Sequence, residues 1–137
     1  MRARILTVSQ IKTDGCEPEE IRTDVRGILR RTGDGYSLRY TEQTEGGTVS
    51  CTLSFSSEQV TLTRTGALDS SLCFRVGYTH AGVYRLPPLS FPHRVTTRRL
   101  SVREQSDGFL INIEYESELG GAAQSAALTL RIVKEAE

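Results

Sequence analysis

The sequence predicts a single all-β domain whose strands close into an antiparallel barrel or sandwich. Short segments with Thr, Ser and alternating apolar residues fill nearly the whole chain, and glycine-bearing turns separate them. Two turn signals stand out, Gly33-Asp34-Gly35 and Asp107-Gly108. Closure is expected because it removes exposed strand edges. A chain of 137 residues fits one domain, spanning 1–137, and is long enough to fold without disulfides or metals.

Ten segments have the composition and alternation of strands, so we expect about eight to ten strands. The alternation is cleanest in 36–40, 49–55 and 109–115, where every second residue is apolar or aromatic. The expected strands are 2–12, 20–31, 36–42, 48–55, 58–64, 71–76, 82–86, 92–103, 109–118 and 124–134.

Two of these segments also fit a helix. The apolar residues of 21–29 fall on one helical face, whereas a strand there requires Gly27 to lie at a bulge or at a barrel corner. Periodicity alone leaves both alternatives open. The Ala-rich segment 122–128 allows a short helical turn within the last strand.

The Asp107-Gly108 signal predicts the register of one hairpin. A two-residue loop at this position places Val102 opposite Ile113 on the inner face. It also places Arg99 opposite Glu116 on the outer face. Apolar residues then lie inside and charged residues outside on both strands.

Upstream of this hairpin the alternation changes phase. Phe91 and Val95 have odd numbers, whereas Leu100 and Val102 have even numbers. One residue of slip must therefore lie between them, because side chains alternate strictly along a regular strand. We expect a β-bulge near 97–99.

The order of several short motifs matches a known family. These motifs are Ile21 through Gly27, Leu38-x-Tyr40-x-Glu42, Arg64-Thr65-Gly66-Ala67, Phe74-x-x-Gly77, Tyr84-Arg85 and Thr96-Thr97. Together with the final strands they resemble the YwiB-like family of small bacterial proteins of unknown function, over nearly the whole chain. The resemblance implies a calycin-like (lipocalin-like) barrel and a strand, not a helix, around Ile21. It carries over no catalytic residue, substrate or cofactor.

Composition narrows the possible partners. Seventeen basic residues balance seventeen acidic ones, which argues against nucleic acid as a partner. No apolar run approaches the roughly 18 residues of a membrane helix, so we expect no membrane partner. The three cysteines are widely spaced, which fits a reducing cytoplasm, and we expect a cytoplasmic protein. Nothing in the pattern favours a monomer over a homodimer.

Signatures of catalysis and of cofactor binding are missing from the sequence. There is no nucleophile elbow, P-loop or dinucleotide fingerprint, and no cysteine pair with metal-binding spacing. His80 and His93 have no suitably spaced cysteine or acidic partner. We therefore expect no catalytic residue, no metal and no cofactor. An uncharacterised enzyme is accordingly the third hypothesis, after the binding protein and the interaction module described below.

The charge of the chain is skewed in one stretch. Between Ser70 and Arg103 there are six arginines and no acidic residue, and five acidic residues follow within the next fifteen. Cross-strand pairs such as that of Arg99 with Glu116 account for part of this skew. The arginines that such pairs leave without a partner suggest anion contacts at one end of the barrel, in a site whose walls are aromatic rings. The candidate ligand-binding residues are Arg75, Arg85, Arg94, His93, Tyr78 and Tyr84.

Strand parity decides where Arg75 points. Arg75 lies outside if Leu72 and Phe74 face inward. It lines the lumen if the other face of the strand, which carries Cys73 and Arg75, is turned inward. An arginine inside a barrel keeps its charge and must find a carboxylate or an anionic ligand. The first hypothesis is thus non-enzymatic binding of a small anionic or amphipathic ligand at a barrel end. The alternative is a protein- or RNA-interaction module that uses the Arg-rich outer strip.

Overall fold

The computed structural model describes residues 1–135, which form ten strands and no helix. Accordingly, this part of the chain has no helix with the length and apolarity needed to cross a membrane. The strands are β1 (Arg2–Thr13), β2 (Glu19–Arg31), β3 (Tyr36–Thr44), β4 (Gly47–Phe55), β5 (Val60–Gly66), β6 (Ser70–Phe74), β7 (Thr79–Leu86), β8 (Leu89–Gln105), β9 (Gly108–Leu119) and β10 (Ala122–Lys134).

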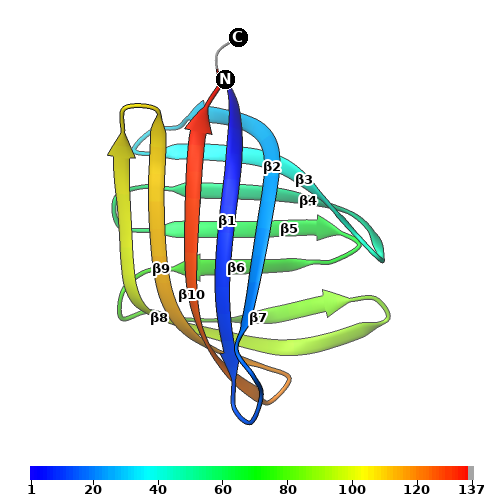
Figure 1. Cartoon of the computed structure of the whole chain (residues 1–137). Helices are drawn as coiled ribbons and strands as arrows, with labels where there is room; N and C mark the ends of the chain where they lie inside the picture. The colour runs from blue at the N-terminus through cyan, green and yellow to red at the C-terminus, as the bar shows by residue number, and fades with distance from the viewer. Residues whose placement is uncertain (136–137) are drawn as a thin grey trace.

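All ten strands belong to one antiparallel sheet that curls into a nearly closed barrel (Figure 1). Consecutive strands pair along the sheet from β6 back to β1, and β1 then pairs with β10, which continues through β9 and β8 to β7. The two edge strands come together at a bridge between Asp69 and Arg85. Two backbone hydrogen bonds of 2.9 and 2.8 Å form this bridge. The predicted all-β antiparallel barrel is confirmed.

Two long strands, β2 and β8, turn the corners of the barrel. The first part of β2 pairs with β1, and from Gly27 onward the strand pairs with β3, whose direction crosses that of β1 (Figure 1). In β8 the pairing with β9 shifts between Thr97 and Arg99. Strands that bend or bulge at corners are typical of sheets packed at a large angle. The strand around Ile21, its corner at Gly27 and the bulge near 97–99 are confirmed.

The register of the β8–β9 hairpin differs from the prediction by two residues. Val102 lies opposite Ile111, and Arg99 lies opposite Glu114. A shift of two residues preserves the face of every side chain, so the predicted inner and outer faces hold while the individual pairs do not.

The reason for this shift is the role of Gly108. It belongs to β9 and pairs with Gln105, so the loop is Ser106-Asp107. A Cβ atom at Gly108 would collide with the backbone carbonyl of Ile132 in β10. The glycine therefore permits a close approach of two strands. It does not occupy the turn position that the sequence predicts.

The Ala-rich segment 122–128 is strand throughout. It forms the first part of β10 and pairs on one side with β9 and on the other with β1. The alternative of a helical turn is wrong, because pairing on both edges outweighs the helix propensity of alanine.

The interior of the barrel has two different ends. At one end, the rings of Tyr36, Phe55 and Phe109 pack together with centroids 4.5 to 5.7 Å apart. We call this the filled end. Along β3 the inner face continues from Tyr36 through Leu38 to Tyr40 and Glu42, and polar side chains replace the apolar ones. We call this second region the polar end.

Candidate functional site

The polar end carries a row of inward-facing side chains on three neighbouring strands. Tyr40 in β3 lies opposite Cys51 in β4, which lies opposite Arg64 in β5. Glu42 follows Tyr40 on the same face of β3. The alternation of buried and exposed residues along each strand turns these four side chains toward the interior. We refer to Tyr40, Glu42, Cys51 and Arg64 as the polar cluster.

Arg64 has a buried donor without a partner. Its Nε atom is buried and has no hydrogen-bond partner in the described part of the protein, and its guanidinium forms no ion pair there. Ser70, directly opposite in β6, has a buried Oγ that is also without a partner among these residues. Buried polar atoms nearly always have partners. Two such atoms at adjacent positions mark a place suited to a polar ligand group.

Burial sets the protonation of the neighbouring groups. It raises the pKa of the Tyr40 hydroxyl well above its usual range and, reinforced by the charge of Glu42, raises the pKa of the Cys51 thiol to about 11. The positive charge of Arg64 opposes both shifts. Both groups are protonated at neutral pH. The Cys51 thiol is therefore a weak hydrogen-bond donor at neutral pH. It is not a nucleophile there, because nucleophilic attack requires a thiolate.

A second group of side chains faces the polar cluster from the other side of the barrel. The rings of Tyr84 in β7 and His93 in β8 lie 6.0 Å apart, edge to face. Burial lowers the pKa of His93, and the charges of His80 and Arg64 lower it further. Arg64 also acts on the pKa of Tyr115, which burial raises. Barrel closure therefore brings β5 within electrostatic reach of β8 and β9.

The lowered pKa of His93 predicts a loss of stability on acidification. In the unfolded chain the imidazole titrates near its ordinary pKa of 6.5, whereas in the folded barrel it takes up its proton only at a lower pH. Between these two values only the unfolded chain binds the extra proton, so falling pH favours unfolding. We expect the urea midpoint to fall between about pH 7.5 and pH 5.5, and to fall less in His93→Gln. An equal fall in both proteins would contradict the assignment.

The structure brings the six candidate ligand residues together only in pairs, Tyr84 with His93 in the interior and Arg75 with Tyr78 on the outside. Arg75 is exposed because Leu72 and Phe74 occupy the inner face of β6, and its guanidinium carbon lies 5.1 Å from the centre of the Tyr78 ring. It is therefore on the outside, the first of the two orientations that parity allowed. Tyr78 is half-buried in the turn after β6.

Arg85 and Arg94 also have exposed side chains on the outer surface. Arg94 lies opposite Glu118 and lines a shallow outer groove that also contains Glu116. A ligand-binding role for all six residues stays a prediction.

The Arg-rich outer strip is partly neutralised by the next strand. Arg98 pairs with Glu116 at 2.8 Å, and Arg99 pairs with Glu114 at 3.3 Å. The predicted pair of Arg99 with Glu116 is wrong because the register lies two residues away. The principle of cross-strand neutralisation holds, although exposed pairs of this kind contribute only about 0.2–1 kcal/mol each.

Sequence reasoning missed the polar cluster, although the sequence contains a signal for it. Arg64 continues the alternation of Val60 and Leu62, and Glu42 continues that of Leu38 and Tyr40. A charged residue in phase with an apolar face is directed into the core. The charge skew after residue 70 drew attention to outer arginines instead.

Comparisons with known proteins agree on the family and the fold. The family model described as Domain of unknown function (DUF1934) matches residues 5–132. The crystal structure of the ywiB protein from Bacillus subtilis is similar with a TM-score of 0.83 at 20% identity, covering 95% of this chain and 90% of that one. No curated protein sequence matches the chain. The chain therefore belongs to the family described as Domain of unknown function (DUF1934), as the resemblance to YwiB-like proteins predicts.

Proposed function

We propose that this protein binds a small anionic ligand at the polar end of its barrel, with Arg64 as the main contact for a carboxylate or phosphate. The observation that carries the proposal is the buried Nε of Arg64, next to the buried Oγ of Ser70. Neither atom has a hydrogen-bond partner in the described part of the protein. A guanidinium stays charged at any physiological pH. An anionic ligand would supply the acceptors and the opposite charge at once.

The surroundings of Arg64 favour a ligand that is amphipathic. Leu62 and Leu72 are buried beside the Arg64–Ser70 pair, and the ring of Phe74 packs against Tyr115 at 5.1 Å. An apolar or aromatic body can contact such a wall while its head reaches the guanidinium. Tyr84 and His93, whose ring centroids lie 6.0 Å apart in an edge-to-face arrangement, would contact the ligand from the opposite side.

Binding accounts for the cluster better than catalysis by a cysteine does. Cys51 is the thiol nearest to Arg64 in the strand register, and burial holds its pKa at about 11. At neutral pH only a minute fraction is thiolate, which is the reactive form. We therefore keep non-enzymatic binding as the proposal.

A ligand-induced thermal shift tests the proposal. We would screen aliphatic and aromatic carboxylates and phosphate monoesters, and analyse the purified protein by native mass spectrometry for a retained ligand. Any compound that shifts the wild type is then tested on Arg64→Met, which keeps the aliphatic stem and removes the charge. A ligand at a hundredfold excess over Kd stabilises the fold by about 2.7 kcal/mol. We expect this stabilisation to vanish in Arg64→Met.

Arg85→Gln and Arg94→Gln are matched controls, because each removes one positive charge from an exposed site. We expect both to keep the thermal shift. The opposite pattern, with the shift lost in Arg85→Gln or Arg94→Gln and kept in Arg64→Met, would overturn the role of Arg64 and support the sequence-based site.

The cytoplasm remains the proposed location, and a monomer or a homodimer the proposed state. All three cysteines are free, and Cys16 is exposed. Exposed free thiols are common where glutathione keeps thiols reduced and rare in oxidising compartments. An RNA or protein partner on the outer strip receives less support, since Arg98 and Arg99 are already paired with glutamates.

A further inference from the structure

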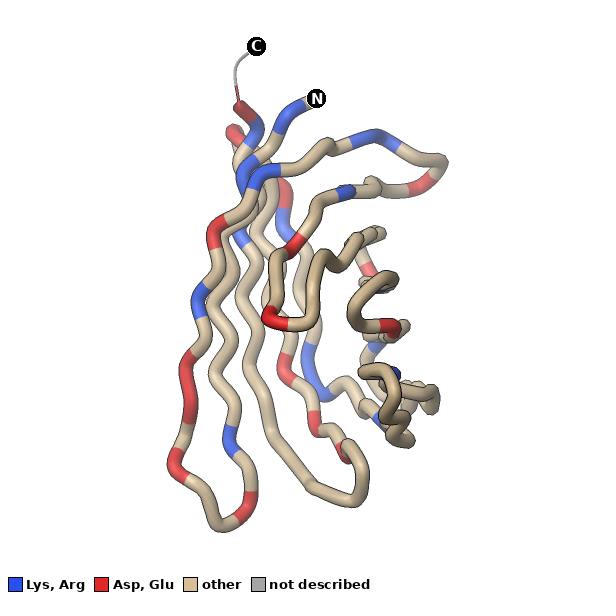
Figure 2. The backbone as a smooth tube through the Cα atoms, turned by 90° about the vertical axis from the view of Figure 1, so that its right-hand side faces the viewer, with Lys and Arg blue, Asp and Glu red and all other residues tan. Residues whose placement is uncertain are grey.

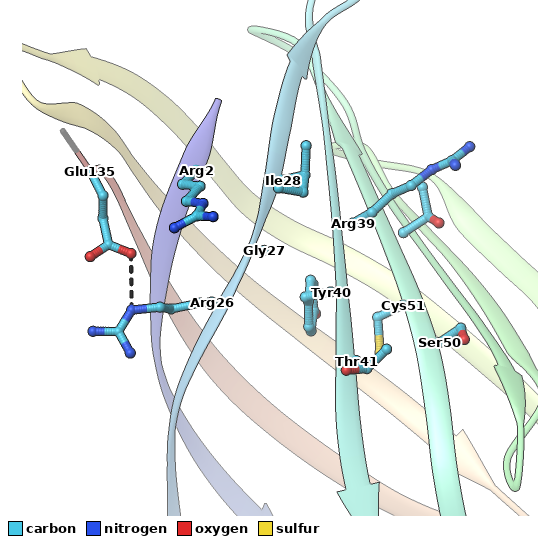
Figure 3. A pocket seen from close by; sticks show the side chains of 11 residues that line it. Arg2, Arg26, Gly27, Ile28, Arg39, Tyr40, Thr41, Ser50, Cys51 and Glu135 are labelled. Carbon is cyan, nitrogen blue, oxygen red and sulfur yellow. Dashed lines mark hydrogen bonds and ion pairs between the residues drawn. The ribbon is translucent and has the colours of Figure 1, made fainter. Parts of the chain in front are cut away.

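A groove of about 650 Å³ lies at the corner where β2 bends away from β1 and toward β3, and its lining includes Tyr40 and Cys51 of the polar cluster as well as outer residues. Figure 3 shows Arg2 and Arg26 on one side of Ile28 and Arg39 on the other. The register explains this arrangement. Ile28 lies opposite Arg2 in β1 and opposite Arg39 in β3, so the three residues form one row across three strands.

The bend that creates the groove depends on Gly27. A Cβ atom at this position would collide with the backbone carbonyl of Arg39, so only glycine lets the strands approach here. Neighbouring strands are about 4.8 Å apart, which places the backbones of Arg2 and Arg39 about 10 Å from each other. In Figure 3 the Arg39 side chain extends away from Ile28. Because this side chain is exposed, it can change rotamer, and the arginines on either side of Ile28 would then converge on one anion above it.

The groove is electropositive although the chain as a whole has no net charge. It is lined by three arginines and one glutamate, Glu135, which leaves two positive charges. Glu135 accepts a hydrogen bond from Nε of Arg26 at 3.0 Å, whereas Arg2 and Arg39 form no ion pair with any described residue. Figure 2 shows basic residues gathered around the chain termini and mostly acidic residues at the opposite end of β1 and β2.

We propose that this groove binds the dianionic head of a small phosphate monoester, with Arg2, Arg26 and Arg39 as its contacts. A phosphate monoester carries close to two negative charges at neutral pH, which matches the local excess. Arginine binds phosphate oxygens in a planar, bidentate geometry. The volume is in the range of small-molecule sites. Ile28, 43% exposed between the arginines, would contact the apolar part of the ester.

Glu135 competes with this ligand. Its carboxylate already neutralises Arg26, so binding of the phosphate must displace that ion pair. The pair is exposed and therefore weak, so the displacement costs little. Removing the carboxylate is expected to strengthen the site.

Phenyl phosphate tests the proposal, with phenyl sulfate as the matched ligand of similar shape and a single charge. We would follow backbone amide shifts by NMR in low salt and fit Kd for each ligand. We expect phenyl phosphate to shift the amides of Arg26, Ile28 and Arg39 and to bind about tenfold more tightly than phenyl sulfate. We expect Arg39→Gln to weaken binding about tenfold, and Glu135→Gln to strengthen it several-fold. Ile28→Ala should weaken the binding of phenyl phosphate but not the binding of inorganic phosphate.

Two control variants separate this site from general electrostatics and from the interior. Arg103→Gln removes the same charge from another exposed, unpaired position among the described residues. Arg64→Met removes the interior anion contact proposed above, so it reports on a second, interior site for phenyl phosphate. We expect neither variant to change the Kd fitted from the amides of Arg26, Ile28 and Arg39. Equal weakening by Arg39→Gln and Arg103→Gln, or no saturable shift at the groove, would overturn the proposal.

Discussion

The variant Phe109→Ala is expected to lose about 3–5 kcal/mol of the free energy of unfolding. Phe109 is 3% exposed, and its ring lies 4.5 Å from that of Tyr36 and 5.0 Å from that of Phe55. Truncation leaves a cavity that β3, β4 and β9 cannot close without losing their pairing. Since small domains have only about 5–15 kcal/mol in total, the loss brings the protein close to its limit. Urea denaturation measures it directly.

Phe91→Ala is the matched control for this prediction. It removes the same atoms from a half-buried position in β8 at the polar end of the barrel. We expect a clearly smaller loss, because a half-exposed ring buries less surface and its removal leaves no closed cavity. Equal losses for the two variants would contradict the division of the interior into a filled end and a polar end.

Arg64→Met is expected to raise the free energy of unfolding by about 1–3 kcal/mol while it abolishes binding of the anionic ligand. The wild type buries the Nε of Arg64 without a hydrogen-bond partner in the described protein. Methionine keeps a flexible apolar stem beside Leu62 and removes the desolvated donor. Thermal denaturation without ligand should therefore give a higher Tm for the variant.

The charge of Glu42 requires a second variant. Glu42 acts on the same neighbours as Arg64, since both affect the pKa of Cys51. Loss of Arg64 alone leaves this carboxylate without the opposing charge, which offsets part of the gain. Arg64→Met combined with Glu42→Gln removes both charges, and we expect it to be at least as stable as Arg64→Met. A lower Tm for both variants would show that Arg64 stabilises the barrel, and the binding proposal would then lose its main argument.

The strands were predictable because their signal is local. Alternation along 36–40 and 109–115 reflects one buried and one exposed face, and the change of phase between Val95 and Leu100 located the bulge. Gly27 was correctly placed at a corner, since a glycine inside an alternating strand marks a bend or a close approach. The register of β8 and β9 was not predictable from its loop, because Gly108 is required by the neighbouring strand β10.

The candidate site was less predictable because closure of the barrel assembles it. The strand that holds Arg64 belongs to one half of the sheet, and β8 with His93 belongs to the other. Their proximity depends on the corners and on the bridge between β6 and β7, which no motif encodes. His93 has the parity of Phe91 and Val95 and shares their face of β8, and Arg64 was identifiable only by its phase with Val60 and Leu62.

The bridge of Asp69 with Arg85 gives the barrel a seam. Every other junction between neighbouring strands is a ladder of five or more residue pairs, whereas the backbone contact of the β6 side with β7 consists of two hydrogen bonds. Opening there breaks few bonds, so the β7 amides along the seam should exchange with deuterium sooner than those of β1 or β10. Arg64 lies on one side of this seam, and Tyr84 and His93 lie on the other. A ligand bound between these residues would hold the two sides of the seam together. Its binding would therefore slow the deuterium exchange of the β7 amides.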